Sequence, residues 1–466
     1  MYPMTIDGKP IEAHTTISVT NPATGAIAAQ APSCDRGQLD AAMDSAQAAF
    51  VTWRADESAR RAAMLELAAA ITAHADELTE ALVAESGKPR GFAAMESEVC
   101  AAWLQVYAGM ELTRDVLQDD DTAHIEVIHR PMGVVAAITP WNFPLGLAMW
   151  KIAPALRAGN TVVLKPSPLS PLATLRLGAL MGQVLPPGVV NTISGGDSLG
   201  ASMTTHRVPR KISFTGSIRA GKAIASASGA DLKRLTLELG GNDAAILLDD
   251  VDVDSAAAQL AAAAFFNAGQ ACALPKRIFA PASRYGEIVE AFAAVVGAMQ
   301  PGEPLDPNTT MGPLSTKPQF ERVTDLVHDA TANGARVVVG GHSLDRPGFF
   351  FAPTVFADCT DEHRIVAEEQ FGPALPILAY GSVEEAVQRA NATEYGLCGS
   401  VWSADQDRAS AIAERLEVGT AYVNAHALLP PHVPFGGSKH SGIGVENGMA
   451  GLLSFTEPQV LHRPRA

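Results

Sequence analysis

Apolar, strand-like segments alternate with helical segments between residues 134 and 237, and this alternation limits the fold more than any other feature of the chain. Strands are expected at residues 134–138, 161–164, 189–193, 211–214 and 235–237, and helices between them at 147–157, 172–181 and 217–227. Strands that alternate with helices form right-handed βαβ units around a parallel sheet. The fold class is therefore α/β with a parallel sheet of the nucleotide-binding kind, although an architecture does not fix a function.

A second α/β series follows Gly240 and Gly241. Its strands are expected at residues 244–248 and 277–280 and around Val337, Ile377 and Val401, and its helices at 256–264, 285–298, 383–390 and 406–416. Ahead of both series, the sequence indicates a hairpin at 5–9, helices over 35–108 with a break at 85–89, and an exposed strand at 123–131. A chain of 466 residues without an internal repeat thus indicates two α/β units and two or three domains.

The composition excludes several classes of function. A formal net charge of −16 argues against a nucleic-acid partner, which needs a basic face. The five cysteines are far apart and form no CxxC pair, so we expect a reducing compartment rather than a disulfide framework or a zinc ribbon. The chain starts without an apolar signal region and has no apolar run of about 18 residues, the length that spans a bilayer. We expect a cytoplasmic protein.

No metal site is expected. The acidic run 249–254 resembles the start of a calcium loop, but Ser255 stands where the loop needs glycine and Ala261 where it needs glutamate. The run is better explained as a cap for the helix that follows it. The histidines are scattered without metal-binding spacing.

Cys272 is the candidate nucleophile. It follows the Ala-rich helix 256–264, which should end near Asn267 or Gly269, because both residues tolerate the left-handed conformation at a helix end. Cys272 then lies on a turn of small residues just past a rigid element, open to a cleft. The alternative is an inert, buried thiol, which is the usual state of a free cysteine.

Two further residues suit thiol chemistry. Glu238 ends an apolar strand, where burial would raise its pKa toward that of a general base. Asn142 follows another strand, and its amide can donate to a developing oxyanion without titrating. Together with a nucleotide-binding fold, Cys272, Glu238 and Asn142 suggest oxidation of a carbonyl through a thioester.

Phosphate and ribose contacts are expected at strand ends. In Phe214-Thr215-Gly216-Ser217 a glycine turn leads into a helix whose first N–H groups would face an anion. Taken alone, this motif is better explained as an ordinary βα turn. Lys165 ends a parallel strand, where ligands of open sheets bind, or else it is an exposed strand end. The acidic pair Glu368-Glu369 is either a cofactor contact or a solvated loop.

Six motifs, in order and spacing over nearly the whole chain, resemble those of the NAD(P)-dependent aldehyde dehydrogenase superfamily. They are Thr139-Pro140-Trp141-Asn142-Phe143-Pro144, Phe214-Thr215-Gly216-Ser217, Leu237-Glu238-Leu239-Gly240-Gly241, Gly269-Gln270-Ala271-Cys272, Glu369-Gln370-Phe371-Gly372-Pro373 and Pro434-Phe435-Gly436-Gly437. The resemblance implies a Rossmann-like cofactor domain (1–112 and 132–240), an α/β catalytic domain (241–442) and a small β oligomerisation element (113–131 and 443–466) of a homodimer or homotetramer.

The resemblance also implies the roles of the site residues. Cys272 would attack an aldehyde as thiolate, Asn142 and the Cys272 backbone N–H would hold the oxyanion, and Glu238 would activate the hydrolytic water. Lys151 matches a lysine linked to proton relay. The implied cofactor contacts are Thr139, Pro140, Trp141, Lys165, Ser167, Phe214, Thr215, Gly216, Ser217, Leu239, Glu369 and Phe371.

One departure concerns the cofactor. Family members that prefer NAD usually carry glutamate three residues after the lysine that binds the ribose, where this chain has Pro168. The change removes a hydrogen bond to the ribose and a repulsion against a 2′-phosphate. NAD is the expected cofactor, and NADP is the alternative.

The substrate is expected to be a medium-sized aliphatic or aromatic aldehyde. The pocket positions implied by the resemblance are apolar or aromatic: Phe143, Trp150, Phe266, Ala271, Ala273 and Phe435. Succinate-semialdehyde members often have arginine where Trp150 stands, so a semialdehyde is the less favoured alternative. Three further alternatives are disfavoured. Glu238 argues against a CoA-acylating enzyme, and the nucleotide-binding pattern argues against a thiol hydrolase that uses no nicotinamide. The complete set of Cys272, Glu238 and Asn142 argues against a non-catalytic binding protein.

Overall fold

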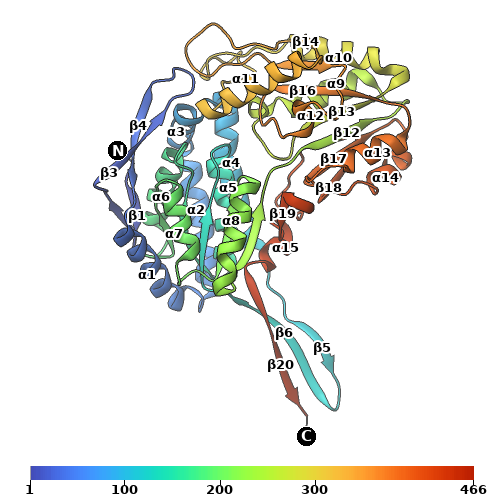
Figure 1. Ribbon diagram of the computed structural model, residues 1–466. Helices are drawn as coiled ribbons and strands as arrows, with labels where there is room; N and C mark the ends of the chain where they lie inside the picture. The colour runs from blue at the N-terminus through green and yellow to red at the C-terminus, as the bar shows by residue number, and fades with distance from the viewer. Residues whose placement is uncertain (1, 466) are drawn as a thin grey trace.

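The computed structural model describes residues 2–465, and its first half is built on an eight-stranded sheet. The strand order is β19-β11-β10-β7-β8-β9-β1-β2, and the five strands from β11 to β9 are parallel (Figure 1). The strands are β1 (Met4–Ile6), β2 (Lys9–Ile11), β7 (Val134–Ile138), β8 (Thr161–Lys165), β9 (Val190–Thr192), β10 (Lys211–Thr215), β11 (Arg234–Glu238) and β19 (Gly442–Ile443). The predicted parallel strands and the N-terminal hairpin are confirmed.

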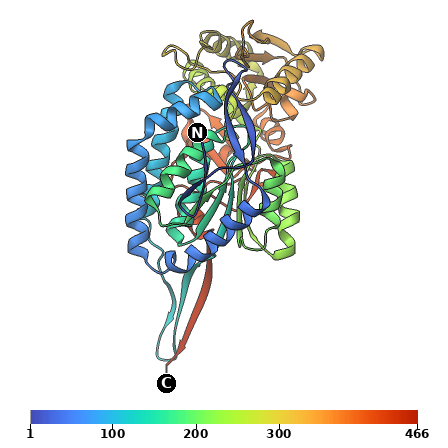
Figure 2. The same cartoon turned by 90° about the vertical axis from the view of Figure 1, so that its left-hand side faces the viewer.

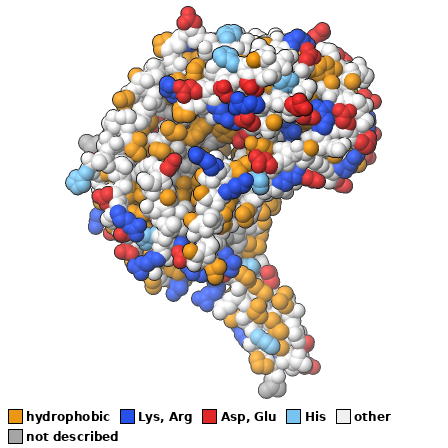
Figure 3. Space-filling view, viewed as in Figure 1, with side chains coloured by type: hydrophobic (Ala, Val, Ile, Leu, Met, Phe, Trp, Pro, Cys, Tyr) orange, Lys and Arg blue, Asp and Glu red, His pale blue; other side chains and the backbone are white. Residues whose placement is uncertain are grey.

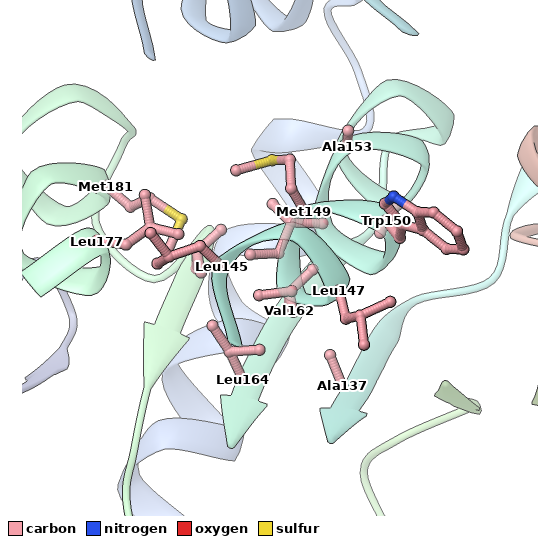
Figure 4. Close-up of a cluster of buried hydrophobic side chains, with 14 of the residues drawn as sticks. Ala137, Leu145, Leu147, Met149, Trp150, Ala153, Val162, Leu164, Leu177 and Met181 are labelled. Carbon is pink, nitrogen blue, oxygen red and sulfur yellow. The ribbon is translucent and has the colours of Figure 1, made fainter. Parts of the chain in front are cut away.

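Two groups of helices accompany this sheet. The crossover helices are α5 (Pro144–Ala158), α6 (Leu172–Val184), α7 (Asp197–Thr205) and α8 (Ile218–Ser228), and the N-terminal helices are α1 (Arg36–Trp53), α2 (Glu57–Ala73), α3 (Ala75–Ser86) and α4 (Arg90–Gly109). Every residue of α5 is buried, including Lys151 and Arg157, and the other residues of this helix are apolar. Figure 4 shows Leu145 and Met149 of α5 packed with Val162 and Leu164 of β8 and with Leu177 and Met181 of α6. The short helix α7 was not predicted.

The second half is built on a seven-stranded sheet in the order β14-β15-β16-β13-β12-β17-β18, with only β14 antiparallel to its neighbour. Its strands are β12 (Asp243–Leu247), β13 (Pro275–Pro281), β14 (Arg336–Val339), β15 (Thr354–Ala357), β16 (Ala374–Tyr380), β17 (Cys398–Trp402) and β18 (Thr420–Val423). Its helices are α9 (Val253–Ala264), α10 (Tyr285–Gly297), α11 (Lys317–Ala332), α12 (Arg364–Ala367), α13 (Val383–Asn391) and α14 (Gln406–Ala413). Each sheet has its own hydrophobic core. Helix α11 was not predicted.

A three-stranded arm projects from the first sheet, as both views show (Figures 1 and 2). It consists of β5 (Asp115–Asp119), β6 (Ala123–Pro131) and β20 (Thr456–Pro464), and β20 pairs with β6 along its whole length. The predicted strand at 123–131 is thus β6, and its partner comes from the end of the chain. Helix α15 (Gly448–Leu453) leads into β20 and packs against α5, while β3 (Thr15–Thr20) and β4 (Ile27–Ser33) form a separate hairpin.

None of the described helices combines the length and the apolar character needed to cross a membrane.

Candidate active site

The candidate site lies where the two sheets face each other. Strand β11 ends at Glu238, and the chain runs directly into β12 at Asp243. The carboxyl edge of the first sheet therefore meets the amino edge of the second, where Cys272 precedes β13 and Glu369 precedes β16. The hollow between the two lobes is visible in Figure 3.

A pocket of about 610 Å³ occupies this junction. On the first sheet it is lined by Pro140, Trp141 and Asn142 after β7 and by the segment from Thr215 to Arg219 after β10. In the strand order, β8 and β9 lie on one side of β7 and β10 and β11 on the other, so the chain reverses its direction of winding between β7 and β10. Open α/β sheets bind ligands at such a switch point, outside the carboxyl ends of the strands.

Cys272 reaches the pocket from the second sheet. The α-helix ends at Ala264, three residues before the predicted end, because a 3₁₀ turn over Phe266–Gly269 takes over. Asn267, Ala268 and Gly269 all have positive φ, of 50°, 55° and 74°. A Cβ on Gly269 would lie 2.3 Å from the Gly372 carbonyl oxygen, so only glycine fits there. The predicted left-handed residues are confirmed, and Cys272 is partly exposed on the pocket wall rather than fully buried.

The carbonyl groups of the loop before Cys272 are held from several directions. The Asn142 side-chain amide donates to the Gln270 carbonyl at 3.0 Å, and the Lys276 ammonium donates to the Ala271 carbonyl at 2.6 Å. Since an amide NH₂ has two donors, Asn142 keeps one N–H for a ligand in the pocket that it lines. The backbone N–H of Cys272 has no acceptor among the described residues. The two donors expected for an oxyanion are thus both available.

The Cys272 thiol is protonated at neutral pH in this structure. Burial raises its pKa to about 12, the negative charges of Glu369, Glu238 and Asp243 add to the rise, and Lys276 opposes it. Attack on a carbonyl therefore requires that a base take the proton or that a positive charge enter the pocket.

Glu238 is a buried carboxyl group without hydrogen-bond partners. The residue is 2% exposed, and neither carboxyl oxygen has a partner among the described residues. Burial, followed by the negative charge of Glu446, raises its pKa well above the usual range, and the Lys151 ammonium opposes the rise. A Cβ on Gly436 would lie 3.5 Å from Glu238 Oε1, so this carboxyl group packs on backbone rather than on side chains. Such a group is suited to accept a proton from a small molecule.

A second buried carboxylate, Glu446, lies beside it and was missed by the sequence analysis. Its Oε1 is 2.6 Å from the Lys151 Nζ, which also donates to the Thr215 hydroxyl at 2.7 Å, and the Ser213 hydroxyl donates to the same Oε1 at 3.2 Å. The side chains of Lys151 and Glu446 are fully buried. A lone glutamate among the small residues of 442–448 was the available signal. The segment expected to serve oligomerisation thus also supplies a charge to the site.

The cofactor side of the pocket contains eight of the twelve expected contacts: Pro140, Trp141, Thr215, Gly216, Ser217, Leu239, Glu369 and Phe371. Glu369 Oε1 accepts the Gly241 N–H at 3.0 Å, and burial raises its pKa to about 7. Trp141 and Phe371 come from opposite sheets and meet edge to face with ring centroids 5.4 Å apart. Gln319 and Arg322 also line the pocket, and they were missed because helix α11 was missed.

The other four expected contacts, Thr139, Lys165, Ser167 and Phe214, do not line this pocket. Phe214 packs beneath Gly216, where a Cβ would lie 2.5 Å from its ring. Thr139 donates its backbone N–H to the Lys165 carbonyl at 3.1 Å, which joins the ends of β7 and β8. Lys165 is 3% exposed, so it is not the solvated strand end considered above. These four residues therefore lie outside the pocket that contains Cys272, and their role as cofactor contacts stays a prediction.

None of the six expected substrate residues lines this pocket, and the four aromatic ones form two groups. Phe143 stacks on Phe266 with centroids 5.8 Å apart, and the Lys88 ammonium lies 4.0 Å from the Phe143 ring centre. Trp150 stacks on Trp103 at 5.8 Å and meets Phe435 edge to face at 5.5 Å. Trp150, Phe435, Ala271 and Ala273 are buried, while Phe143 and Phe266 are partly exposed.

The pocket suits a nicotinamide dinucleotide. Ser217 caps α8 by accepting the Ala220 N–H, so the first turn of this helix can receive phosphate. A Cβ on Gly240 would lie 2.5 Å from Glu369 Oε2, so the glycine leaves this carboxylate accessible at the pocket wall, where it can accept ribose hydroxyl groups. Residues Trp141, Ser217, Glu369 and Phe371 would hold such a group.

Comparisons with known proteins agree with this geometry. The chain matches the model of the aldehyde dehydrogenase family over residues 10–461. It is 39% identical over 453 residues to the putative aldehyde dehydrogenase FUS7 of Gibberella fujikuroi, covering 97% of this chain and 96% of that protein. It is 38% identical over 478 residues to phenylacetaldehyde dehydrogenase of Pseudomonas fluorescens, covering 99% and 95%. An NAD⁺ complex of aldehyde dehydrogenase from Bacillus cereus superimposes with a TM-score of 0.97 at 34% identity, covering 100% and 97%.

The fold and the site thus define a nicotinamide-dependent oxidoreductase of α/β class. The chain belongs to the aldehyde dehydrogenase family, whose members oxidise aldehydes with NAD or NADP.

Proposed function

We propose that this enzyme oxidises a medium-sized aliphatic or aromatic aldehyde to the carboxylic acid, with Cys272 as nucleophile. The proposal rests on one combination of groups. Cys272 and Asn142 line the same pocket, and Asn142 keeps a free amide N–H there. The carboxyl group of Glu238 has no hydrogen-bond partner among the described residues, and its charge helps to raise the pKa of the Cys272 thiol.

The reaction begins at Cys272. The thiol first gives up its proton to water in the pocket, and the Sγ then attacks the carbonyl carbon. The carbonyl oxygen gains the negative charge that Asn142 Nδ2–H and the Cys272 N–H stabilise. The bound nicotinamide supplies the acceptor for the hydride that leaves this carbon, and the product on the enzyme is a thioester. Glu238 then takes a proton from water, whose oxygen adds to the thioester carbon. The C–S bond breaks, the acid leaves and Cys272 regains its proton.

Lys151 and Glu446 act through Glu238 in this proposal. Glu446 raises the pKa of Glu238 and Lys151 lowers it, and their ion pair holds both charges in fixed positions. A base with a raised pKa accepts the proton of water more readily. The pair therefore positions and tunes Glu238 rather than touching the aldehyde.

The substrate class rests on the apolar and aromatic residues that the family resemblance implies for the substrate, and on the lack of a free cation beside them. Lys88, which lies against Phe143, is already paired with Glu96, so it is not available for a substrate carboxylate. This disfavours a semialdehyde that carries a carboxylate. The relative named phenylacetaldehyde dehydrogenase supports an aryl-substituted aldehyde.

NAD is the proposed cofactor, with NADP as the alternative, and residues 1–112 with 132–240 and residues 241–442 are the proposed cofactor and catalytic domains. The arm formed by β5, β6 and β20 is proposed to pair with a second copy in a homodimer or homotetramer, because Val116, Leu117 and Val460 on it are 55%, 67% and 60% exposed. Sedimentation of the wild type and of Val460→Glu tests this role. We place the enzyme in the cytoplasm.

The central experiment measures absorbance of the reduced nicotinamide for wild type and Cys272→Ala, with NAD or NADP and with hexanal, benzaldehyde, phenylacetaldehyde and succinate semialdehyde. Cys34→Ala is the matched control, because Cys34 is also partly exposed with a pKa raised to about 12 but lies outside the pocket. Turnover of the apolar aldehydes that is lost only in Cys272→Ala supports the proposal. Equal activity in Cys272→Ala, or a preference for succinate semialdehyde, contradicts it.

A further inference from the structure

Lys165 is a buried cation with a single hydrogen bond among the described residues. Lys165 is the last residue of β8, which lies between β7 and β9 in the sheet. The residues that follow β7 line the pocket. The Lys165 ammonium is 3% exposed and makes one hydrogen bond, to the Pro166 carbonyl at 3.2 Å. Since an ammonium has three donors, two remain for a ligand at this end of the sheet. The burial lowers its pKa to about 8, and the charge of Asp197 opposes this shift.

No carboxylate follows Lys165 on its own loop, where residues 166–171 are proline, serine or leucine. Asp197 is the one acidic group that acts on Lys165 in the described chain. It comes from the next loop, after β9, and opens helix α7. The side chain of Asp197 is exposed and has no hydrogen bond or ion pair among the described residues. It is therefore available to a ligand.

Lys165 and Asp197 lie at the same end of the first sheet. A Cβ on Gly200 would lie 3.9 Å from Lys165 Cε and 4.0 Å from Cδ, so the lysine side chain lies along α7. Asp197 is three residues before Gly200, and residues at that spacing share one face of a helix. Both distances are ordinary van der Waals contacts, so the Lys165 side chain lies beside the first turns of α7. The first turn also favours a negative charge, because it is the positive end of the helix dipole.

The family resemblance already implies that Lys165 contacts the adenosine ribose. We propose that the Asp197 carboxylate binds the same ribose and makes the enzyme select NAD over NADP. A ribose offers two neighbouring hydroxyl groups, so Lys165 can donate to one oxygen while the Asp197 carboxylate accepts from a hydroxyl. A 2′-phosphate would bring up to two negative charges against that carboxylate. Asp197 thus supplies, from a different loop, the carboxylate that Pro168 does not. This inference rests on the proposed function, since it assumes that the dinucleotide extends from the pocket past Lys165.

The test measures binding without aldehyde, so it does not depend on turnover. The dissociation constants of NADH and NADPH are determined by nucleotide fluorescence for the wild type, Asp197→Ser and Asp197→Asn. Asp407→Ser is the matched control, because Asp407 is also exposed in the first turn of a short helix, α14, and has no partner among the described residues, but it belongs to the other sheet. Thermal melting checks that each variant is folded.

The wild type should bind NADH at least about tenfold more tightly than NADPH, as expected for one extra charge repulsion near a surface. Both Asp197 variants should lose most of this ratio, with NADPH binding more tightly and NADH somewhat more weakly, while Asp407→Ser keeps the wild-type ratio.

A ratio within about twofold of wild type in both Asp197 variants, or an equal shift in Asp407→Ser, overturns the inference but leaves the proposed function standing. A wild type that binds neither nucleotide overturns both.

Discussion

Glu96 and Glu238 are two carboxyl groups with the same degree of burial and opposite surroundings. Glu96 is 4% exposed, accepts the N–H groups of Leu145 and Gly146 at 2.9 and 3.0 Å, and forms an ion pair with Lys88. Glu238 is 2% exposed and has no partner on either oxygen among the described residues. Burial alone therefore does not distinguish a structural carboxylate from a reactive one; the number of hydrogen bonds does.

Glu96 and Glu238 differ in their hydrogen bonding because only Glu96 caps a helix. Glu96 fixes the first turn of α5, the helix that begins directly after Asn142 and Phe143, so it supports the position of Asn142, the proposed oxyanion donor. Glu85 stabilises the first turn of α6 in the same way, because it accepts the Ala173 N–H at 3.0 Å. Glu238 caps no helix, and its hydrogen-bonding capacity is unmet among the described residues, as the proposed role of a general base requires.

The largest effect is expected at Glu238. Glu238→Gln should lower kcat by about 10²- to 10⁴-fold, since it removes a general base. Because the base acts after hydride transfer, a first-turnover burst of reduced nicotinamide should remain, and the midpoint of thermal unfolding should not fall. Stopped-flow absorbance and melting curves check both points. A variant that loses the burst together with the steady state would show that Glu238 is needed before the thioester forms.

Glu96→Gln should have the opposite outcome, with a loss of stability and little loss of kcat per folded molecule. The change leaves the Lys88 ammonium buried without its partner, which typically costs about 3–5 kcal/mol of unfolding free energy. Urea unfolding measures the loss. The double variant Lys88→Met/Glu96→Gln is the control and should recover part of it. A single variant as stable as the wild type would remove the distinction between the two carboxylates.

The pH dependence of stability separates Glu85 from exposed carboxylates. Burial raises the pKa of Glu85 from 4.5 to about 8, so between these values the native state holds a proton that the unfolded chain releases. The contribution of Glu85 to stability is therefore complete below about pH 4.5 and is lost as pH rises through about 8, at about 1.4 kcal/mol for each pKa unit. Glu85→Gln should flatten the slope of unfolding free energy against pH in this window. An unchanged slope would mean that Glu85 is ionised at neutral pH.

The smallest effect is expected for an exposed ion pair. Lys317 and Glu321 pair one helical turn apart with side chains 68% and 58% exposed. Glu321→Gln should change the unfolding free energy by less than about 0.5 kcal/mol, because water screens such pairs. Urea unfolding beside Glu96→Gln gives the comparison directly. A cost similar to that of Glu96→Gln would show that charge pairing, and not burial of an unpaired group, sets the larger value.

Most of the elements could be predicted from local patterns. The five parallel strands of the first sheet, the strand β6 and the helices α5, α6 and α8 were expected close to their observed bounds. Helix α11 was missed although Val323, Leu326, Val327 and Ala330 repeat at helical spacing, because its polar face dominates the composition. Helix α7 was missed because it is short and rich in small polar residues.

The site residues that belong to a recognisable sequence motif could be predicted. Cys272, Asn142 and Glu369 line one pocket, as the motifs implied, and the roles of all three stay proposals. Glu446 was not predictable by such reasoning, because its partner Lys151 lies 295 residues earlier in the chain and neither belongs to a motif that names the other.

Hydrophobic periodicity and glycine positions are local properties, and they determined the α/β class, the order of the elements and the turn that presents Cys272. Which edges of the sheets meet, which carboxyl group lacks partners and which loop supplies the charge beside Lys165 depend on contacts between distant segments. Burial and hydrogen bonding arise only when those segments pack together. Only the tertiary structure therefore decided that Glu96 supports a helix while Glu238 is buried without a hydrogen-bond partner among the described residues.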